Sequence, residues 1–298
     1  MSALRSADVV ARHVPFGFLF RDASDLSVVP DGLSVRITDS GLPHRSALLL
    51  PTPSGTWMSP KLPGLGIDAA ADSTQWPNIA RPWQVDVADA LGRYLPVRFT
   101  AKLPNRGRVE WPVWKATGNG PRLKPLVPPG APAKYKPDYL PLFPSIARTP
   151  PGPRATVRAH LAYKGEDGDR PAAWAAVAVS IDGKRLGLGL ADAAGAVAVS
   201  FPYPSLPDQT SQQAAAGRKE VEWEAILEIY HDPELAGDPP PLEDLIGQLA
   251  LPPVKALGKL GAPDEPLEAQ TLVLGRALTV RTGPADKEVI SSLYLEPA

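Results

Sequence analysis

The chain has 298 residues, a net charge of −1, 44% hydrophobic residues and 21% charged residues. This balance excludes a disordered chain and fits two domains of about 100–150 residues each. The lack of a basic surplus argues against a general nucleic-acid-binding protein, and the absence of cysteine excludes disulfides and thiolate metal sites.

The N-terminal segment does not resemble a secretory signal, because Arg5, Asp8 and Arg12 interrupt its apolar residues. No stretch of the sequence approaches the ~18 consecutive apolar residues of a membrane span. We therefore expect a cytoplasmic protein without a membrane span, which is assembled in the cytoplasm and is released, if at all, as part of a particle.

Residues 1–104 are predicted to form a first β-sandwich domain. Leu33, Val35 and Ile37 alternate with polar residues, which is the period of a half-buried strand. Other short extended runs, separated by turn residues, lie at 48–50, 57–58, 83–87 and 95–103. Short strands between turns are typical of a β-sandwich, and the last two runs predict a hairpin.

Residues 105–153 are predicted to form a proline-rich strap between two domains. Thirteen of the fifty residues from Pro104 to Pro153 are proline, which lacks a backbone N–H and holds φ near −65°, so this stretch forms neither a helix nor an inner strand. Its aromatic residues favour packing on a surface, either of this chain or of a partner. The candidate interface residues are Trp76, Trp111, Trp114, Tyr135, Tyr139 and Phe143.

Residues 154–298 are predicted to form a second β-sandwich domain. Apolar residues alternate with polar ones at 157–161, 197–201 and 223–229, and Trp174 to Ile181 is a continuous apolar run. A short helix is predicted over 241–251, because proline stands in its first turn and its leucines and isoleucine share one stripe. Four tryptophans at inward strand positions are assigned to the two cores: Trp57, Trp83, Trp174 and Trp223.

Two segments resemble the carboxypeptidase regulatory-like family of β-sandwiches, with its transthyretin-like and collagen-adhesin B-type relatives. Residues 54–64, SGTWMSPKLPG, match its turn-Gly-x-aromatic pattern followed by Leu-Pro-Gly. Residues 191–197, ADAAGAV, and 201–204, FPYP, match the same pattern less closely, with Val197 in the aromatic position. The resemblance implies that the glycine forms a turn, that the aromatic residue fills the core, and that the chain holds two copies of one fold.

Four other groups could carry chemistry, and each has a structural explanation that we prefer. His231-Asp232 could form a catalytic relay but fits a turn. Glu166, Asp167 and Asp169 could bind calcium but fit a solvated hairpin tip. Glycines at 187–190 lack a P-loop lysine and fit a strand with close backbone approach. The remaining group is an acidic strand face that fits a solvated charge row better than a glycosidase pair: Glu222, Glu224 and Glu228.

Because no catalytic, cofactor or metal motif is found, we predict a non-enzymatic structural or adaptor protein of a large multi-protein assembly. In the resembled family such domains are usually non-catalytic modules for adhesion, spacing or assembly. The layout of two sandwiches and a strap also looks like accessory proteins of phage-tail-like contractile injection particles. The alternatives are a glycan- or ligand-binding module, which would need aromatic residues aligned on one exposed sheet face, and an enzyme whose site is scattered over loops.

Overall fold

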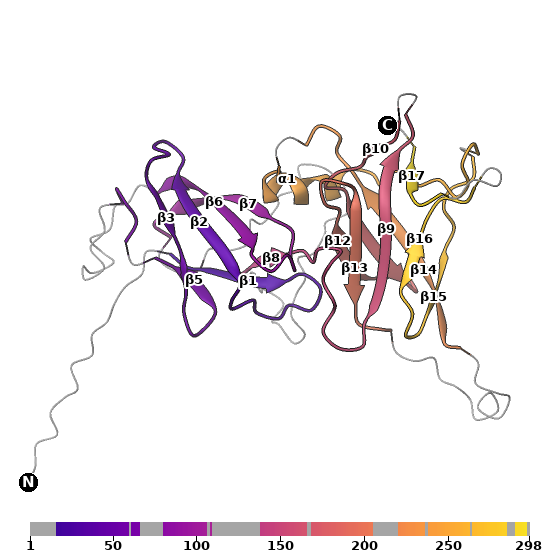
Figure 1. Ribbon diagram of the computed structural model, residues 1–298, viewed down its shortest axis with the longest axis horizontal. Coiled ribbons are helices and arrows are strands. Elements are labelled where there is room, and N and C mark those ends of the chain that lie inside the picture. The colour runs from indigo at the N-terminus through magenta and orange to yellow at the C-terminus, as the bar shows by residue number, and fades with distance from the viewer. Residues whose placement is uncertain are drawn as a thin grey trace, which may run out of the picture.

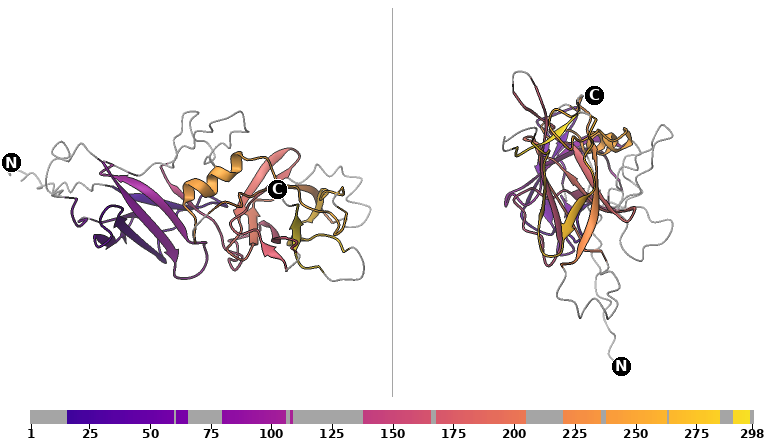
Figure 2. Two further views of the ribbon diagram at one scale, coloured as in Figure 1. Left: turned by 90° about the horizontal axis from the view of Figure 1, so that it is seen from above. Right: turned by 90° about the vertical axis from the view of Figure 1, so that its right-hand side faces the viewer.

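The computed structural model describes residues 16–59, 61–65, 80–105, 108, 138–165, 168–204, 220–235, 238–262, 264–284 and 290–296. Over these residues the chain is mainly β, with one short helical segment, as predicted. Two β-sandwich units lie one after the other along the longest axis, and the helical segment lies between them (Figure 1). The view from above in Figure 2 shows the same elongated arrangement.

The first unit is built from two four-stranded sheets. One sheet has the order β4-β5-β1-β8, with β1 at Phe18–Asp22, β4 at Leu50–Pro51, β5 at Thr56–Met58 and β8 at Leu140–Leu142. The other has the order β3-β2-β6-β7, with β2 at Leu33–Asp39, β3 at Ser46–Leu48, β6 at Arg81–Asp89 and β7 at Val97–Leu103. The alternation of buried and exposed residues along β2 confirms the half-buried strand that the sequence predicts.

The second unit also has two sheets. One has the order β12-β11-β14-β15, with β11 at Ala176–Ile181, β12 at Lys184–Leu190, β14 at Glu222–Tyr230 and β15 at Gln270–Val273. In the other, the long strand β9 pairs with four strands; its members are β9 at Ala155–Tyr163, β10 at Arg170–Pro171, β13 at Ala196–Phe201, β16 at Leu278–Val280 and β17 at Leu293–Leu295.

The two units share one strand order. The antiparallel sheet β3-β2-β6-β7 corresponds to β12-β11-β14-β15, in the same sequence of strands. In the other sheet, β1 pairs with β5 antiparallel and with β8 parallel, just as β9 pairs with β13 antiparallel and with β16 parallel. This correspondence agrees with the predicted duplication of one fold.

The glycine turns of the two resembling segments carry the same hydrogen bonds. The N–H of Thr52 donates to the carbonyl of Thr56 at 2.8 Å, and the N–H of Gly55 donates to the carbonyl of Thr52 at 2.9 Å. In residues 192–196 the same two distances are 2.9 and 3.0 Å. The side chain of the first residue, Thr52 or Asp192, accepts the N–H of the last residue in each case. Thr52 therefore takes the role of the aspartate that the first segment lacks.

Replacement of Gly195 by alanine is expected to lower the free energy of unfolding by about 1–3 kcal/mol. Gly195 has a φ of +84°, which is strained for any residue with a Cβ, and an added Cβ would lie 2.3 Å from the carbonyl oxygen of Leu161. Gly275→Ala is the control, because Gly275 has a φ of +79° but open space around its Cβ position. Urea denaturation should show the larger loss for Gly195→Ala, and equal losses would contradict the steric part of this account.

The position of β8 corrects the predicted domain boundaries. β8 lies at the C-terminal end of the proline-rich region and pairs with β1 of the first unit. It is an edge strand. Proline is tolerated there because the strand has no second neighbour to which Pro141 would have to donate a hydrogen bond. Residues 104–139 therefore form an insertion of 36 residues between β7 and β8, whereas the equivalent connection in the second unit, 274–277, has four residues. The connector between the units is the shorter segment from Pro144 to Arg154.

An apolar junction joins the units. The helix α1, Leu242–Gly247, and the following 3-10 turn η2, Gln248–Ala250, confirm the helix predicted over 241–251. A single cluster of buried apolar residues extends from the core of the first unit to α1 and to the outer face of β11, where it includes Ala176 and Ala178. The residues that alternate with them, Val177 and Val179, face the core of the second sandwich. β11 is thus buried on both faces, which explains its continuous apolar sequence.

The start of α1 also covers a strand edge of the first unit. The backbone N–H of Thr100, on the edge strand β7, donates to the Glu243 carboxylate at 3.2 Å, and Arg98 forms an isolated bridge with Pro241. Strand edges carry unpaired backbone groups that favour aggregation unless they are covered. The second unit therefore both buries apolar surface of the first and contacts its edge strand β7.

Candidate functional site

The structure corrects the expectation for two of the six predicted interface residues. Tyr139 and Phe143 are only 1% and 2% exposed and lie in the interior of the chain, beside β8. They became buried because β8 is part of the first sandwich, so they offer no surface to a partner. The other four predicted interface residues, Trp76, Trp111, Trp114 and Tyr135, lie outside the described residues. All four tryptophans assigned to the cores are buried, as predicted: Trp57, Trp83, Trp174 and Trp223.

A buried polar cluster lies at the connector between the units. The carboxylate of Asp22, at the end of β1, is fully buried and forms an ion pair with the guanidinium of Arg148. It also accepts the backbone N–H of Ser24 at 2.7 Å and the hydroxyl of Tyr94 at 3.2 Å. Arg148 lies over the Tyr94 ring, with its guanidinium carbon 4.4 Å from the ring centroid. Burial and the charge of Asp22 raise the pKa of Tyr94 to about 12, so the hydroxyl keeps the proton that it donates.

Arg154 contacts both units. Its guanidinium donates to the carbonyl of Ser24 and to the hydroxyl of Ser200 on β13, the latter at 3.3 Å, and it lies 4.0 Å from the Asp25 carboxylate. Burial lowers the pKa of Arg154, and the nearby carboxylates of Asp25 and Asp22 oppose this effect. Arg154, at the end of the connector, thus adds polar contacts to both units beside the apolar junction.

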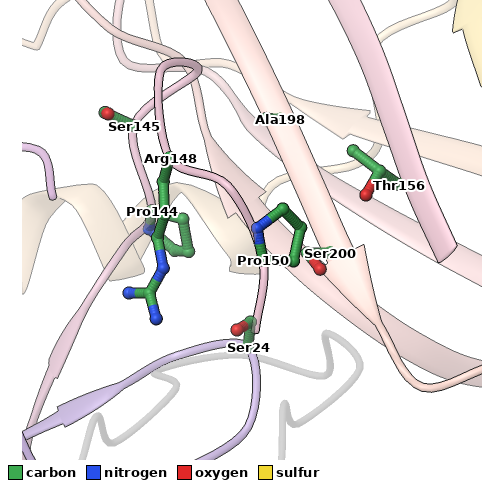
Figure 3. A pocket seen from close by; sticks show the side chains of 8 residues that line it. All are labelled: Ser24, Pro144, Ser145, Arg148, Pro150, Thr156, Ala198 and Ser200. Atoms are coloured by element: carbon green, nitrogen blue, oxygen red, sulfur yellow. The ribbon is translucent and has the colours of Figure 1, made fainter. Parts of the chain in front are cut away.

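A small crevice lies beside this cluster (Figure 3). It has a volume of about 10 Å³, room for about one water molecule. Figure 3 shows the Arg148 side chain and Ser24 on the side of the first unit, with Thr156 and Ser200 on strands of the second. The crevice is lined by Ser24, Pro144, Ser145, Arg148, Pro150, Thr156, Ala198 and Ser200. The crevice therefore lies where the connector packs against the second sandwich.

Asp22, Tyr94, Arg148 and Arg154 were missed by the sequence-based prediction. They lie far apart in the chain, and none belongs to a motif. Asp22 ends an aromatic strand, and a carboxylate at that point is equally compatible with a solvated turn. Only the return of β8 to β1 places the connector, and with it Arg148, against Asp22.

His231 follows the end of β14, as predicted, but its partner is not Asp232. Its Nδ1 lies 2.8 Å from the hydroxyl of Tyr163, while the Asp232 carboxylate accepts the backbone N–H of Glu234 at 3.0 Å in a local turn. Burial lowers the pKa of His231, against the opposing influence of the Ala173 backbone and the Asp232 charge. Burial also raises the pKa of Tyr163. The pair is a neutral contact between the ends of β9 and β14.

This lowered pKa predicts a pH dependence of stability. Because the folded-state pKa of His231 lies below its unfolded value of 6.5, the unfolded chain binds more protons below that pH, so stability falls as the pH drops from about 6.5 toward the folded-state pKa. We expect His231→Gln to reduce this slope in thermal unfolding, while His44→Gln, at an exposed position, leaves it unchanged. An unaltered slope in His231→Gln would contradict this assignment.

The other candidate groups occupy structural positions. Gly187 and Gly189 lie in β12, and a Cβ on Gly187 would come within 2.8 Å of side chains of β13, so these glycines permit close approach of the two sheets, as predicted. Asp169 lies 3.4 Å from the ammonium of Lys164 and accepts the Tyr294 hydroxyl; Glu166 and Asp167 lie outside the described residues.

The three glutamates of the acidic row on β14 differ in exposure and in pairing. Glu222 and Glu224 are exposed, whereas Glu228 forms an ion pair with Arg185 of β12 at 3.0 Å. β14 lies inside its sheet rather than at an edge, so the row does not protect an edge. Among the residues that the structure describes, no cluster of three or more histidine, aspartate or glutamate residues could hold a metal ion, and no helix is long and apolar enough to cross a membrane.

Comparison of the chain with protein-family models, with curated proteins and with solved structures gave no match. The resemblance to carboxypeptidase regulatory-like domains therefore depends on the two sequence segments alone.

Proposed function

We propose that the chain is a non-enzymatic structural adaptor of a large multi-protein assembly. The observation that carries this proposal is a difference between two copies of one fold. They share their strand order, but the first carries 36 residues between β7 and β8, whereas the equivalent connection of the second, between β15 and β16, has four. An insertion that leaves the sandwich complete is free to serve a partner.

The junction between the units supports the same role. An adaptor has to hold its binding surfaces at a fixed separation, and apolar interfaces restrict the relative motion of domains. Here the buried apolar cluster, the covered edge of β7 and the Arg154 contacts all join the two units. The chain would then act as a short rigid rod with an insertion on one of its units.

The composition of the insertion favours a protein partner. Residues 104–139 contain Trp111, Trp114 and Tyr135 among many prolines. Tryptophan and tyrosine supply much of the binding energy of protein interfaces, and proline lowers the entropy lost on binding. The assembly that the layout most resembles is a phage-tail-like contractile injection particle, whose sheath and tube proteins are the partners we propose.

The experiment replaces residues 109–137 by the four-residue turn 274–277 of the second unit, which keeps the buried Tyr139 and the Arg108–Asp138 ion pair. It compares the partners that co-purify with the shortened and the full-length chain from native lysate. We expect the shortened chain to retain its β-sheet circular dichroism and to lose its assembly partners. As a control, Trp111→Ala with Trp114→Ala should reduce the recovery of the same partners. A full-length chain that elutes from native lysate as a free monomer would overturn the proposal.

A further inference from the structure

On the side of the first unit opposite the junction lies an apolar strand edge that pairs with no further strand among the described residues. β3 and β4 follow each other in the chain and form the outer edges of the two sheets. We call Ser46–Pro51 the β3–β4 edge. Leu48 and Leu50 are 55% and 67% exposed, while Leu49 between them is buried in the core. Strand edges with exposed apolar residues form templates for the addition of another strand.

The second unit shows that this edge is not a requirement of the fold. The equivalent edge strand, β12, begins with exposed Lys184 and Arg185, and two of its later positions are glycines packed against β13. Charged residues on an edge strand oppose pairing with another strand. The same topological position is therefore charged in one copy and apolar in the other, which suggests a use for the apolar one.

Basic side chains surround the β3–β4 edge. Arg36 is exposed and lies directly opposite Leu48 on β2, and Arg45 immediately precedes β3. The Arg45 guanidinium lies against Gly64, where an added Cβ would be 2.4 Å from Nη1, and the exposed Lys61 precedes Gly64 by three residues. Within the described part of the chain, Arg36, Arg45 and Lys61 form no ion pair.

We propose that the β3–β4 edge binds an extended segment of a partner protein in which apolar residues alternate with acidic ones. The apolar side chains would cover Leu48 and Leu50, the backbone would extend a sheet, and the carboxylates would meet Arg36, Arg45 and Lys61. Within the described residues no further strand pairs with this edge, so its backbone groups would bond to the partner segment, and the basic side chains would select the charge of the partner. This inference rests on the proposed adaptor function, because it supplies a second docking surface besides the insertion.

The test uses the purified full-length chain and a fluorescein-labelled peptide of alternating valine and glutamate, with binding measured by fluorescence anisotropy. We expect this peptide to bind, and a peptide of alternating valine and lysine not to bind. Leu50→Lys should weaken binding at least tenfold. Leu91→Lys is the matched control, since Leu91 is also 67% exposed but lies in the turn between β6 and β7, and it should leave binding unchanged.

Further measurements decide between the proposal and its rivals. Arg36→Glu with Arg45→Glu should reverse the preference toward the lysine peptide, and N-methylation of the peptide backbone should abolish binding. Equal losses in Leu50→Lys and Leu91→Lys would overturn the proposal. A concentration-dependent dimer that Leu50→Lys dissolves would assign the edge to a second copy and also overturn it. If Leu50→Lys still co-purifies with the assembly while the peptide fails to bind, the adaptor function stands and the edge proposal fails.

Discussion

Replacement of Asp22 by alanine is expected to lower the free energy of unfolding by about 3–5 kcal/mol, the cost of leaving a buried charge without its partner. Asp22 is fully buried, and its loss would leave the Arg148 guanidinium, whose side chain is 12% exposed, without a counter-charge. The backbone N–H of Ser24 and the Tyr94 hydroxyl would lose their acceptor at the same time. Equilibrium denaturation with guanidinium chloride measures the change.

Asp31→Asn is the control for this prediction. Asp31 also lies near an arginine, with its carboxylate 3.6 Å from Arg93, but its side chain is 78% exposed. Exposed ion pairs contribute about 0–1 kcal/mol, so this variant should retain nearly all of its stability. Asp22→Asn removes the charge and keeps the size of the side chain, and its amide oxygen can still accept the N–H of Ser24. A loss below about 1 kcal/mol in Asp22→Ala would contradict the role given to the cluster.

Replacement of Leu245 by alanine is expected to lower stability by about 2–5 kcal/mol and to loosen the junction between the units. Leu245 is fully buried in α1, within the apolar cluster that joins the two sandwiches. Removal of a buried leucine side chain loses its transfer free energy and leaves a cavity. Because the cavity would lie at the junction, we expect calorimetry to resolve the unfolding of the two units, and small-angle X-ray scattering to report a larger radius of gyration.

Leu251→Ala provides the matched control, because Leu251 follows the same helical segment but is 39% exposed. Such surface substitutions usually change stability by no more than about 0.5 kcal/mol. If Leu245→Ala lowered the stability but left the scattering profile and a single unfolding transition unchanged, α1 would belong to one unit alone, and the rigid-rod account would lose its main support.

The sequence by itself determined the local elements. Alternation along Leu33 to Asp39 predicted β2, the glycines at 55 and 195 predicted turns, and the leucine stripe with a leading proline predicted α1. These features depend on neighbouring residues, because side-chain period and backbone freedom are local properties. The same local pattern placed Trp57, Trp83 and Trp223 in the interior, whereas Trp174 is buried in a turn before β11, with a φ of +63°, and not in the strand that was predicted to begin there.

Only the tertiary structure decided how the proline-rich region belongs to the chain. Its composition indicated a spacer between domains, and the return of β8 to β1 showed that most of it is an insertion within the first sandwich. That pairing joins strands more than a hundred residues apart, and nothing in Leu140-Pro141-Leu142 specifies its neighbour. The burial of Tyr139 and Phe143, the Asp22–Arg148 ion pair and the Arg154 contacts all follow from it, since strand pairing and charge pairing at long range are set by the closure of the sheets and not by the residues next in sequence.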